Sequence, residues 1–174
     1  MPRQNSQLKI LVVDDVPSNL RIIQTVLEAD YDLFFATDGP KALHLAHTEQ
    51  PDMVLLDIMM QNMDGYEVCR RLKADPVTRA ITVLFISAKH DIMDEAKGLM
   101  LGASDFILKP IEPILLKARI MEHGRRIAAS QQLHNRIEEL ENRLTHAALL
   151  VQKVARGNSQ ALPELMNLLG VTKP

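Results

Sequence analysis

Residues 9–15 read KILVVDD, an apolar run that ends in two aspartates. Because the run is almost continuously apolar, it is typical of a strand in a parallel sheet that helices cover on both faces. Similar runs recur downstream. We expect strands at Lys9–Val13, Asp32–Ala36, Asp52–Leu56, Ile81–Ile86 and Asp105–Leu108.

Stretches of helical periodicity separate these runs. They predict helices at Pro17–Ala29, Pro40–Glu49, Gly65–Ala74 and Ile92–Leu101. This alternation of strands and helices is the pattern of successive βαβ units. The sequence therefore predicts an α/β fold with a doubly wound, five-stranded parallel sheet.

Length and composition restrict the classes of function. A chain of 174 residues is long enough for one domain and an extension. Its net charge of −2 gives no general electrostatic reason to bind nucleic acid or an anionic membrane. No apolar run approaches the roughly 18 to 20 residues of a membrane span, and residues 1–7 lack a signal peptide's apolar stretch. We expect a cytoplasmic protein, with Cys69 as a packing residue.

The charge is unevenly divided along the chain. Residues 1–123 contain 13 Lys and Arg against 18 Asp and Glu, whereas residues 124–174 contain 7 against 4. Two differently built segments follow from this asymmetry. We expect a disordered tail at 1–7, a folded domain at 8–123, a helical stalk or coiled coil at 124–156 and a short helical tail at 157–174.

The stalk carries an apolar heptad pattern. Its members, spaced alternately by four and three residues, are Leu133, Ile137, Leu140, Leu144, Ala147, Val151 and Val154. With Ile137, Leu144 and Val151 at a and the others at d, the pattern favours a parallel homodimer. Arg136 at g then faces Glu141 at e of a second copy. The alternative is a monomeric helix that folds back on its own domain.

Several residues mark the expected limits of the stalk helix. Gly124 and the polar run 130–132 interrupt the apolar pattern and indicate a bend, and Gly157 indicates the end of the helix. Glu139 and Arg143 are spaced for an i,i+4 ion pair. A second helix is expected at 164–169, which either docks on another molecule or packs against the stalk.

Reactive side chains follow four of the five expected strands. They are Asp14 and Asp15 after the first, Asp57 after the third, Ser87 after the fourth and Lys109 after the fifth. Open α/β sheets bind ligands at the carboxyl ends of their strands. Three carboxylates at one edge favour a hard cation such as Mg²⁺, while a lysine and a hydroxyl suit a phosphoryl group. Individually, Asp14 or Asp15 could instead cap the helix at Pro17, and Lys109 or Ser87 could be structural.

These residues lie in motifs that resemble the receiver domain of two-component response regulators. The motifs are VVDD at 12–15, LLDIMM at 55–60, MDGYEV at 63–68, FISA at 85–88 and GASDFILKP at 102–110. The resemblance covers about residues 8–123. It implies a flavodoxin-like fold with strand order 2-1-3-4-5 and, as the phosphoryl donor, a histidine kinase or phosphotransfer protein. It also implies a signalling protein that acts on a downstream protein target rather than an enzyme.

The resemblance also implies a role for each site residue. Asp57 is the phosphoacceptor, and it would hold Mg²⁺ together with Asp14, Asp15 and the carbonyl of Met59. Lys109 would contact the phosphoryl group and precede a cis proline, and Ser87 and Phe106 would form the switch pair.

The loop after Asp57 departs from the family's frequent MPGMDG, since it has Gln61 and Asn62 there. Asn tolerates the left-handed backbone that glycine supplies, so we expect the turn to survive. Met59 and Lys89 are expected to tune the lifetime of the phosphoryl group.

One other interpretation remains open, and two more lack a sequence feature that they would need. The run ILLKAR at 114–119 resembles linkers that precede diguanylate cyclase domains, so the chain could be a fragment of a larger regulator. An aspartyl phosphatase of the haloacid dehalogenase type would need a second aspartate where Val16 stands. Flavin binding would need a hydroxyl-rich and glycine-rich loop, but the loop here is acidic.

Overall fold

The computed structural model describes residues 7–88, 98–158 and 160–170. Its sheet consists of β1 (Lys9–Val13), β2 (Asp32–Ala36), β3 (Met53–Asp57), β4 (Thr82–Ser87) and β5 (Asp105–Leu108). The strands are parallel and lie in the order β2-β1-β3-β4-β5. The predicted flavodoxin-like fold is therefore confirmed. Strands β3 and β4 end one residue later than predicted, so that Asp57 and Ser87 are themselves the last residues of strands.

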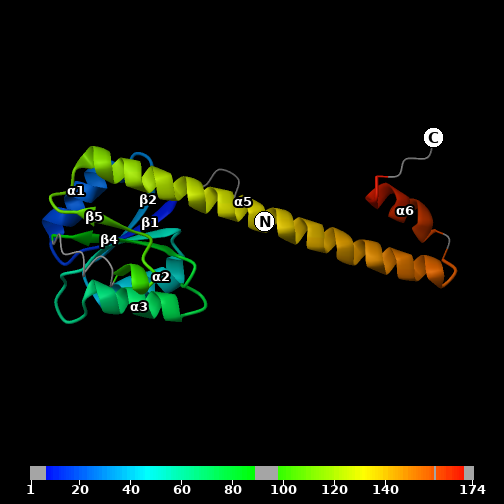
Figure 1. The fold of residues 1–174 in the computed structure, drawn as a ribbon, viewed down its shortest axis with the longest axis horizontal. Helices are drawn as coiled ribbons and strands as arrows, with labels where there is room; N and C mark the ends of the chain where they lie inside the picture. Colours follow the sequence, from blue (N-terminus) through cyan, green and yellow to red (C-terminus); the bar gives the residue numbers. More distant parts are fainter. Residues whose placement is uncertain (1–6, 89–97, 159, 171–174) are drawn as a thin grey trace. The chain divides into compact units, whose positions relative to one another are not determined.

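Helices lie on both faces of the sheet (Figure 1). They are α1 (Pro17–Leu27), α2 (Gly39–Glu49), α3 (Gly65–Ala74), α5 (Pro113–Ala155) and α6 (Ala161–Leu168). Most of the helix predicted at Ile92–Leu101, together with Lys89 and the tail expected to be disordered, lies outside the described residues.

The N-terminus of α1 rules out one alternative for the first two aspartates. The residue before α1 is Val16, and no side chain caps that end. Asp38 and Asp64, by contrast, each accept a hydrogen bond from a backbone N–H in the first turn of α2 and α3. The suggestion that Asp14 or Asp15 caps α1 is therefore wrong, and these two carboxylates are available for the site.

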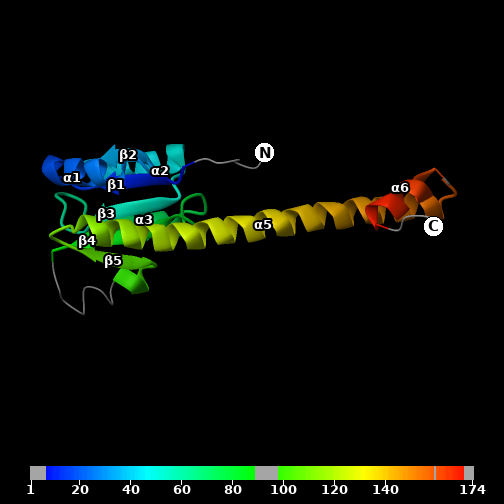
Figure 2. The same ribbon diagram turned by 90° about the horizontal axis from the view of Figure 1, so that it is seen from above.

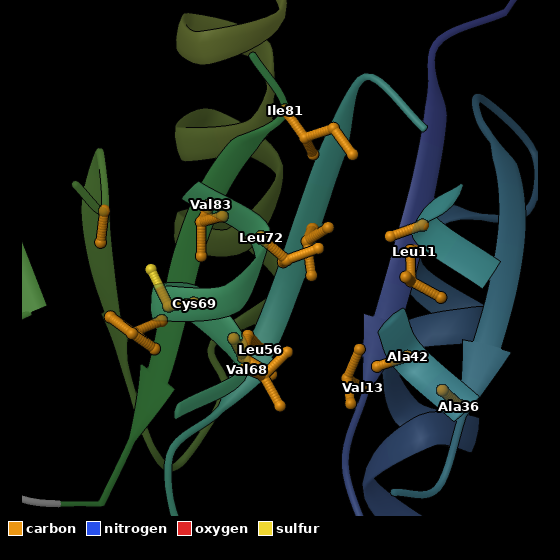
Figure 3. Close-up of a cluster of buried hydrophobic side chains, with 14 of the residues drawn as sticks. Leu11, Val13, Ala36, Ala42, Leu56, Val68, Cys69, Leu72, Ile81 and Val83 are labelled. Carbon is orange, nitrogen blue, oxygen red and sulfur yellow. The ribbon is translucent and has the colours of Figure 1, made fainter. Parts of the chain in front are cut away.

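Alternate side chains of each central strand enter two separate apolar cores, as the two-residue period of a strand requires. Leu11, Val13 and Leu56 pack beneath α2 and α3, where Cys69 lies fully buried among them (Figure 3). On the other face the core is formed by Ile10, Val12, Leu55, Leu84, Ile86, Ile23, Leu27, Leu116 and Ile120. Burial raises the pKa of the Cys69 thiol, which fits the packing role predicted for it. Both cores fix the strand ends that carry the site.

Helix α5 continues without interruption through Gly124 and residues 130–132, the positions at which the sequence indicated a bend (Figure 2). A Cβ at Gly124 would lie 3.6 Å from Leu8, its nearest neighbour, so this glycine sits in an ordinary packed position. A single glycine costs only about 1 kcal/mol in a helix interior. The chain divides into two compact units between Ile127 and Ala128.

The second unit contains the rest of α5 and the helix α6. The apolar stripe of α5 is largely exposed there, with Leu133, Ile137, Leu140, Leu144 and Val151 all open to solvent. The ion pair predicted between Glu139 and Arg143 is replaced by one between Arg136 and Glu139 at 2.6 Å. Helix α5 ends at Ala155, and Gly157 adopts a positive φ of 86°, as expected for a helix end. Helix α6 begins three residues earlier than predicted.

Among the residues that the structure describes, none of the helices is both long and apolar enough to cross a membrane.

Candidate functional site

The carboxyl ends of the parallel strands bring the predicted reactive side chains to one edge of the sheet. Asp14 directly follows β1, Asp57 ends β3, Ser87 ends β4 and Lys109 directly follows β5. Carboxylate oxygens of Asp14, Asp15 and Asp57 lie within 4.8 Å of one another. Residues far apart in the sequence thus form one cluster, as the strand ends predicted.

Lys109 supplies the positive charge in this cluster. Its Nζ lies 2.9 Å from Oδ2 of Asp14 and 3.1 Å from Oδ1 of Asp57. Burial lowers the pKa of Lys109, but its hydrogen bond to Asp14 and the negative charges of both carboxylates outweigh burial and raise it overall. The peptide bond between Lys109 and Pro110 is cis, as the resemblance implied. Lys109 therefore stays protonated between two carboxylates.

Asp57 is buried at the centre of the cluster. Its pKa is raised, mainly because burial disfavours the carboxylate and also because Asp14 repels it, although Lys109 and the backbone N–H of Met59 oppose this. Lys109 contacts Oδ1 as an ion pair. Among the described residues, this Oδ1 is the buried side-chain atom left without a hydrogen-bond partner.

The donor set fits a magnesium ion. Mg²⁺ takes hard oxygen ligands and is usually held by one or two carboxylates, with waters completing its shell. Three clustered carboxylates supply those oxygens, and the unsatisfied Oδ1 of Asp57 is the kind of buried atom that a bound ion would satisfy. The residues present are thus suited to the cation that the sequence predicted.

Asn19 is a site residue that sequence reasoning missed. Its Nδ2 lies 3.0 Å from Oδ1 and 2.9 Å from Oδ2 of Asp14, and the N–H of Val16 donates to the same carboxylate. These donors fix the orientation of the Asp14 side chain. The only sequence signal was a polar residue in the first turn of α1, close to the strand end, which is too common to stand out.

The loop after β3 is joined to the site by its backbone. The N–H of Gln61 donates to Oδ2 of Asp15 at 3.2 Å, and Asn62 adopts a left-handed φ of 64°. The turn therefore survives the departure from the family's usual sequence, as expected. A Cβ at Gly65 would lie 2.3 Å from the carbonyl oxygen of Asp57, so α3 can begin this close to the site only with glycine. Met59 is exposed at the rim.

The predicted switch residues lie on adjacent strands. Ser87 is buried, and its carbonyl accepts a hydrogen bond from the N–H of Lys109 at 2.8 Å. Phe106 is half-buried, and its ring centroid lies 5.3 Å from that of Phe85. A Cβ at Gly98 would come within 2.4 Å of the Phe106 ring. The ring of Phe106 therefore fills the space beside Gly98.

A hydrogen-bonded group joins β5 to α5 directly before Phe106. Asp105 Oδ2 lies 3.0 Å from Nε2 of His123 and 3.0 Å from Arg119, while Oδ1 accepts the N–H of Phe106. Burial favours the neutral acid, but these partners outweigh it and lower the pKa of Asp105. Sequence reasoning missed this group because its members lie on two elements.

A family model for the response regulator receiver domain matches residues 10–121. The chain belongs to this family. The response regulator PleD of Caulobacter vibrioides is 49% identical over 113 residues, which are 64% of this chain and 25% of PleD. The Bacillus subtilis transcriptional regulatory protein PhoP is 39% identical over 140 residues, 78% of this chain and 57% of PhoP. A Vibrio cholerae relative named "Probable cyclic di-GMP phosphodiesterase" is 38% identical over 136 residues, 78% of this chain and 31% of that protein.

Solved structures agree with the family. The receiver domain of Francisella response regulator 1452 is 29% identical, with a TM-score of 0.64, over 68% of this chain and 98% of that domain. The Vibrio cholerae chemotaxis protein CheY4, at 24% identity, shares the fold with a TM-score of 0.65 over 67% of this chain and 98% of its own. This chain is thus the receiver domain of a response regulator with a C-terminal helical extension. It spans between a quarter and just over half of the length of the three curated relatives named above.

Proposed function

We propose that Asp57 is the phosphoacceptor of this receiver domain and that its phosphorylation switches contacts made through the C-terminal extension. The observation that carries the proposal is the position of Asp57, between two further carboxylates and the ammonium of Lys109. A buried carboxylate with one unsatisfied oxygen is both a nucleophile and a metal ligand. The expected donor is a histidine kinase or a phosphotransfer protein.

In the proposed step, a carboxylate oxygen of Asp57 attacks the phosphorus of a phosphohistidine. The new bond joins that oxygen to phosphorus, the P–N bond breaks, and its electron pair returns to the imidazole of the donor. Lys109 lies 3.1 Å from Asp57, where its charge would stabilise the equatorial phosphoryl oxygens. The product is an acyl phosphate on Asp57.

Mg²⁺ would be held by Asp14, Asp15, Asp57 and the carbonyl of Met59. When bound, the ion supplies positive charge that offsets the negative charge of the phosphoryl group. Asn19 and the N–H of Val16 orient Asp14 toward this role, and Gln61 orients Asp15. Met59 and Lys89 are proposed to tune the lifetime of the phosphoryl group.

Switching is proposed to use Ser87 and Phe106. The hydroxyl of Ser87 would bond the phosphoryl group and leave room for the Phe106 ring to turn inward. Such a rotation would change the face formed by β5, α5 and the helix predicted at Ile92–Leu101. Asp105 links the backbone of Phe106 directly to His123 on α5, so a change in β5 is passed to the helix that extends into the stalk.

The extension is proposed to form a parallel homodimer. Five of its seven heptad residues are exposed, with Leu144 at 70% and Val151 at 52%. In such a dimer Arg136 at g would face Glu141 of the partner. We propose that this dimer signals to a downstream protein target in the cytoplasm, without catalytic activity and without direct contact to nucleic acid or membrane.

A second candidate is supported by the relatives. PleD and the Vibrio cholerae protein are longer than this chain, and the name of the second refers to hydrolysis of cyclic di-GMP. This chain would then be the receiver and linker of a larger regulator, such as a diguanylate cyclase, whose output is enzymatic. Reading the genomic open reading frame beyond residue 174 distinguishes the two, since a catalytic domain in frame would favour the larger regulator.

Light scattering tests the proposed switch. The native chain and Asp57→Asn are compared in Mg²⁺, before and after beryllofluoride, which mimics a phosphoryl group on a carboxylate. We expect beryllofluoride to change the mass or the radius of the native chain only. A response by both proteins would show that the effect does not depend on Asp57, and a response by neither would contradict phosphorylation-dependent association.

A further inference from the structure

Helix α6 folds back on the end of α5 and forms a hairpin with it. Leu150 on α5 and Ala161 on α6 are buried in the second unit. Arg143 donates to the carbonyl of Leu168 at 3.2 Å, which satisfies an oxygen at the C-terminus of α6. His146 lies 3.5 Å from Glu164. Contacts at both ends of α6 therefore fix the hairpin.

The hairpin uses a face of α5 that differs from the predicted dimer seam. With Leu144 and Val151 at heptad position a, the contact residues Arg143 and Leu150 occupy g and His146 occupies c. These positions lie on one flank of the a and d stripe, roughly a quarter turn from it at 100° per residue. Helix α6 therefore leaves Leu144 and Val151 uncovered while it covers the flank beside them.

Helix α6 itself has a wide apolar face. Ala161, Leu165 and Leu168 are spaced by four and three residues and are buried or half-buried. Leu162, Met166 and Leu169 repeat the same spacing one residue later, and Leu162 and Leu169 remain 46% and 61% exposed. At 100° per residue these six residues form one wide apolar face, and α5 covers only part of it. The uncovered part of this face, at Leu162 and Leu169, indicates that α6 has a further neighbour.

We propose that two copies of this hairpin pair as a four-helix bundle at the end of the stalk, so that α6 is part of the dimer interface. The proposal rests on the dimer described under Proposed function and extends it. In a four-helix bundle each helix packs on two neighbours whose directions differ by about a quarter turn. Helix α5 meets this requirement, with α6 on one face and the exposed a residues Leu144 and Val151 on the other, while the d residues Ala147 and Val154 between them are half-buried.

The charge pattern of the stalk supports a second copy as the occupant, because Arg136 at g would face Glu141 at e of that copy. Three heptads are near the minimum length for a coiled coil, and a stable interface needs about 800 Å² from each partner. The stripe of Leu162, Met166 and Leu169 enlarges the apolar face of the last heptad. It would also extend the coiled-coil seam, whose register Arg136 and Glu141 would set nearer the start of the stalk.

The test measures the dimer dissociation constant of the full chain by sedimentation equilibrium, in Mg²⁺ with and without beryllofluoride. The variants Leu162→Glu and Leu169→Glu place a charge on the exposed stripe, and Asn167→Glu adds the same charge to an exposed polar position of α6. We expect each leucine variant to weaken the dimer at least about tenfold and Asn167→Glu to change it less than about twofold. Far-ultraviolet circular dichroism checks that all three variants keep the helicity of the native chain.

The possible outcomes separate this proposal from the dimer itself. The variant Leu144→Glu tests the coiled-coil seam and is expected to abolish association. If it does so while both leucine variants of α6 dimerise like the native chain, the bundle is wrong and the coiled coil stands. A tighter dimer after removal of residues 160–174 would show that α6 competes with the partner, which also overturns the bundle. A native chain that stays monomeric in both conditions would remove the bundle together with the proposed dimer.

Discussion

The Nζ atom of Lys109 lies 3.1 Å from Oδ1 of Asp57, although 52 positions separate the two residues in the sequence. Lys109 also contacts Asp14, so one ammonium faces two carboxylates. The two carboxylates raise the pKa of Lys109, whereas the pKa of Asp57 is raised mainly by burial and also by repulsion from Asp14. The site has an excess of negative charge that a cation would relieve.

Replacing Asp57 by Asn is expected to raise the free energy of unfolding by about 1 kcal/mol at pH 7 without Mg²⁺. The raised pKa means that the fold disfavours the carboxylate. The contribution of Asp57 is therefore favourable below the unfolded pKa of about 3.9 and is lost as the pH rises through the folded value. Urea unfolding with and without Mg²⁺ measures this, and Mg²⁺ should stabilise only the native protein. A variant that is less stable than the native chain, or equally stabilised by Mg²⁺, would contradict the account.

Replacing Lys109 by Met is expected to lower the free energy of unfolding by about 3 kcal/mol, because it leaves the buried carboxylates without their counter-charge. It should also suppress phosphorylation by a small phosphodonor. Lys117→Met is the matched control, since Lys117 pairs at 3.0 Å with Asp30 where both side chains are exposed. That change should cost less than about 1 kcal/mol. Similar losses in the two variants would be evidence against a special role for Lys109.

Replacing Asp105 by Asn tests the connection between β5 and α5. The partners of Asp105 lower its pKa, so its contribution is present above the unfolded pKa of about 3.9 and is lost as the pH falls through the folded value. We expect the native protein to lose about 1 to 2 kcal/mol more than the variant between pH 5 and pH 2. Chemical denaturation across this range provides the comparison, and parallel pH profiles would show that Asp105 adds nothing.

Replacing Gly65 by Ala is expected to destabilise the domain by about 2 to 3 kcal/mol, because the new Cβ would collide with the carbonyl of Asp57. Gly124→Ala is the control within a helix. There the nearest atom is 3.6 Å away, and the higher helix propensity of alanine should stabilise the protein by up to about 1 kcal/mol. Thermal unfolding distinguishes the two. Equal effects of the two substitutions on thermal stability would show that a side chain at position 65 fits beside the carbonyl of Asp57.

The strand ends could be predicted from the sequence because two local signals coincide there. Apolar runs indicate buried strands, and a reactive side chain directly after such a run is placed at the carboxyl edge by topology alone. Asp14, Asp57, Ser87 and Lys109 all follow this rule. Asn19 and Gln61 do not, since one acts from a helix and the other through its backbone N–H.

The extension was predicted less well for a different reason. Heptad spacing indicated the helix, which continues through Gly124 because one glycine is tolerated in a long helix. The expected partner of Glu139 was Arg143, which instead contacts Leu168. That contact exists only because the chain turns after α5 at Gly157 and brings α6 back beside it. Local spacing cannot indicate such a contact.

Mapping the phosphorylated residue tests the central claim most directly. The native chain is incubated with acetyl phosphate and Mg²⁺, reduced with borohydride, digested and sequenced by mass spectrometry. Borohydride converts an acyl phosphate on aspartate to homoserine, so we expect homoserine at position 57 in the native chain and none in Asp57→Asn. Homoserine at position 14 or 15, or an unmodified Asp57 in a folded protein, would contradict the assignment.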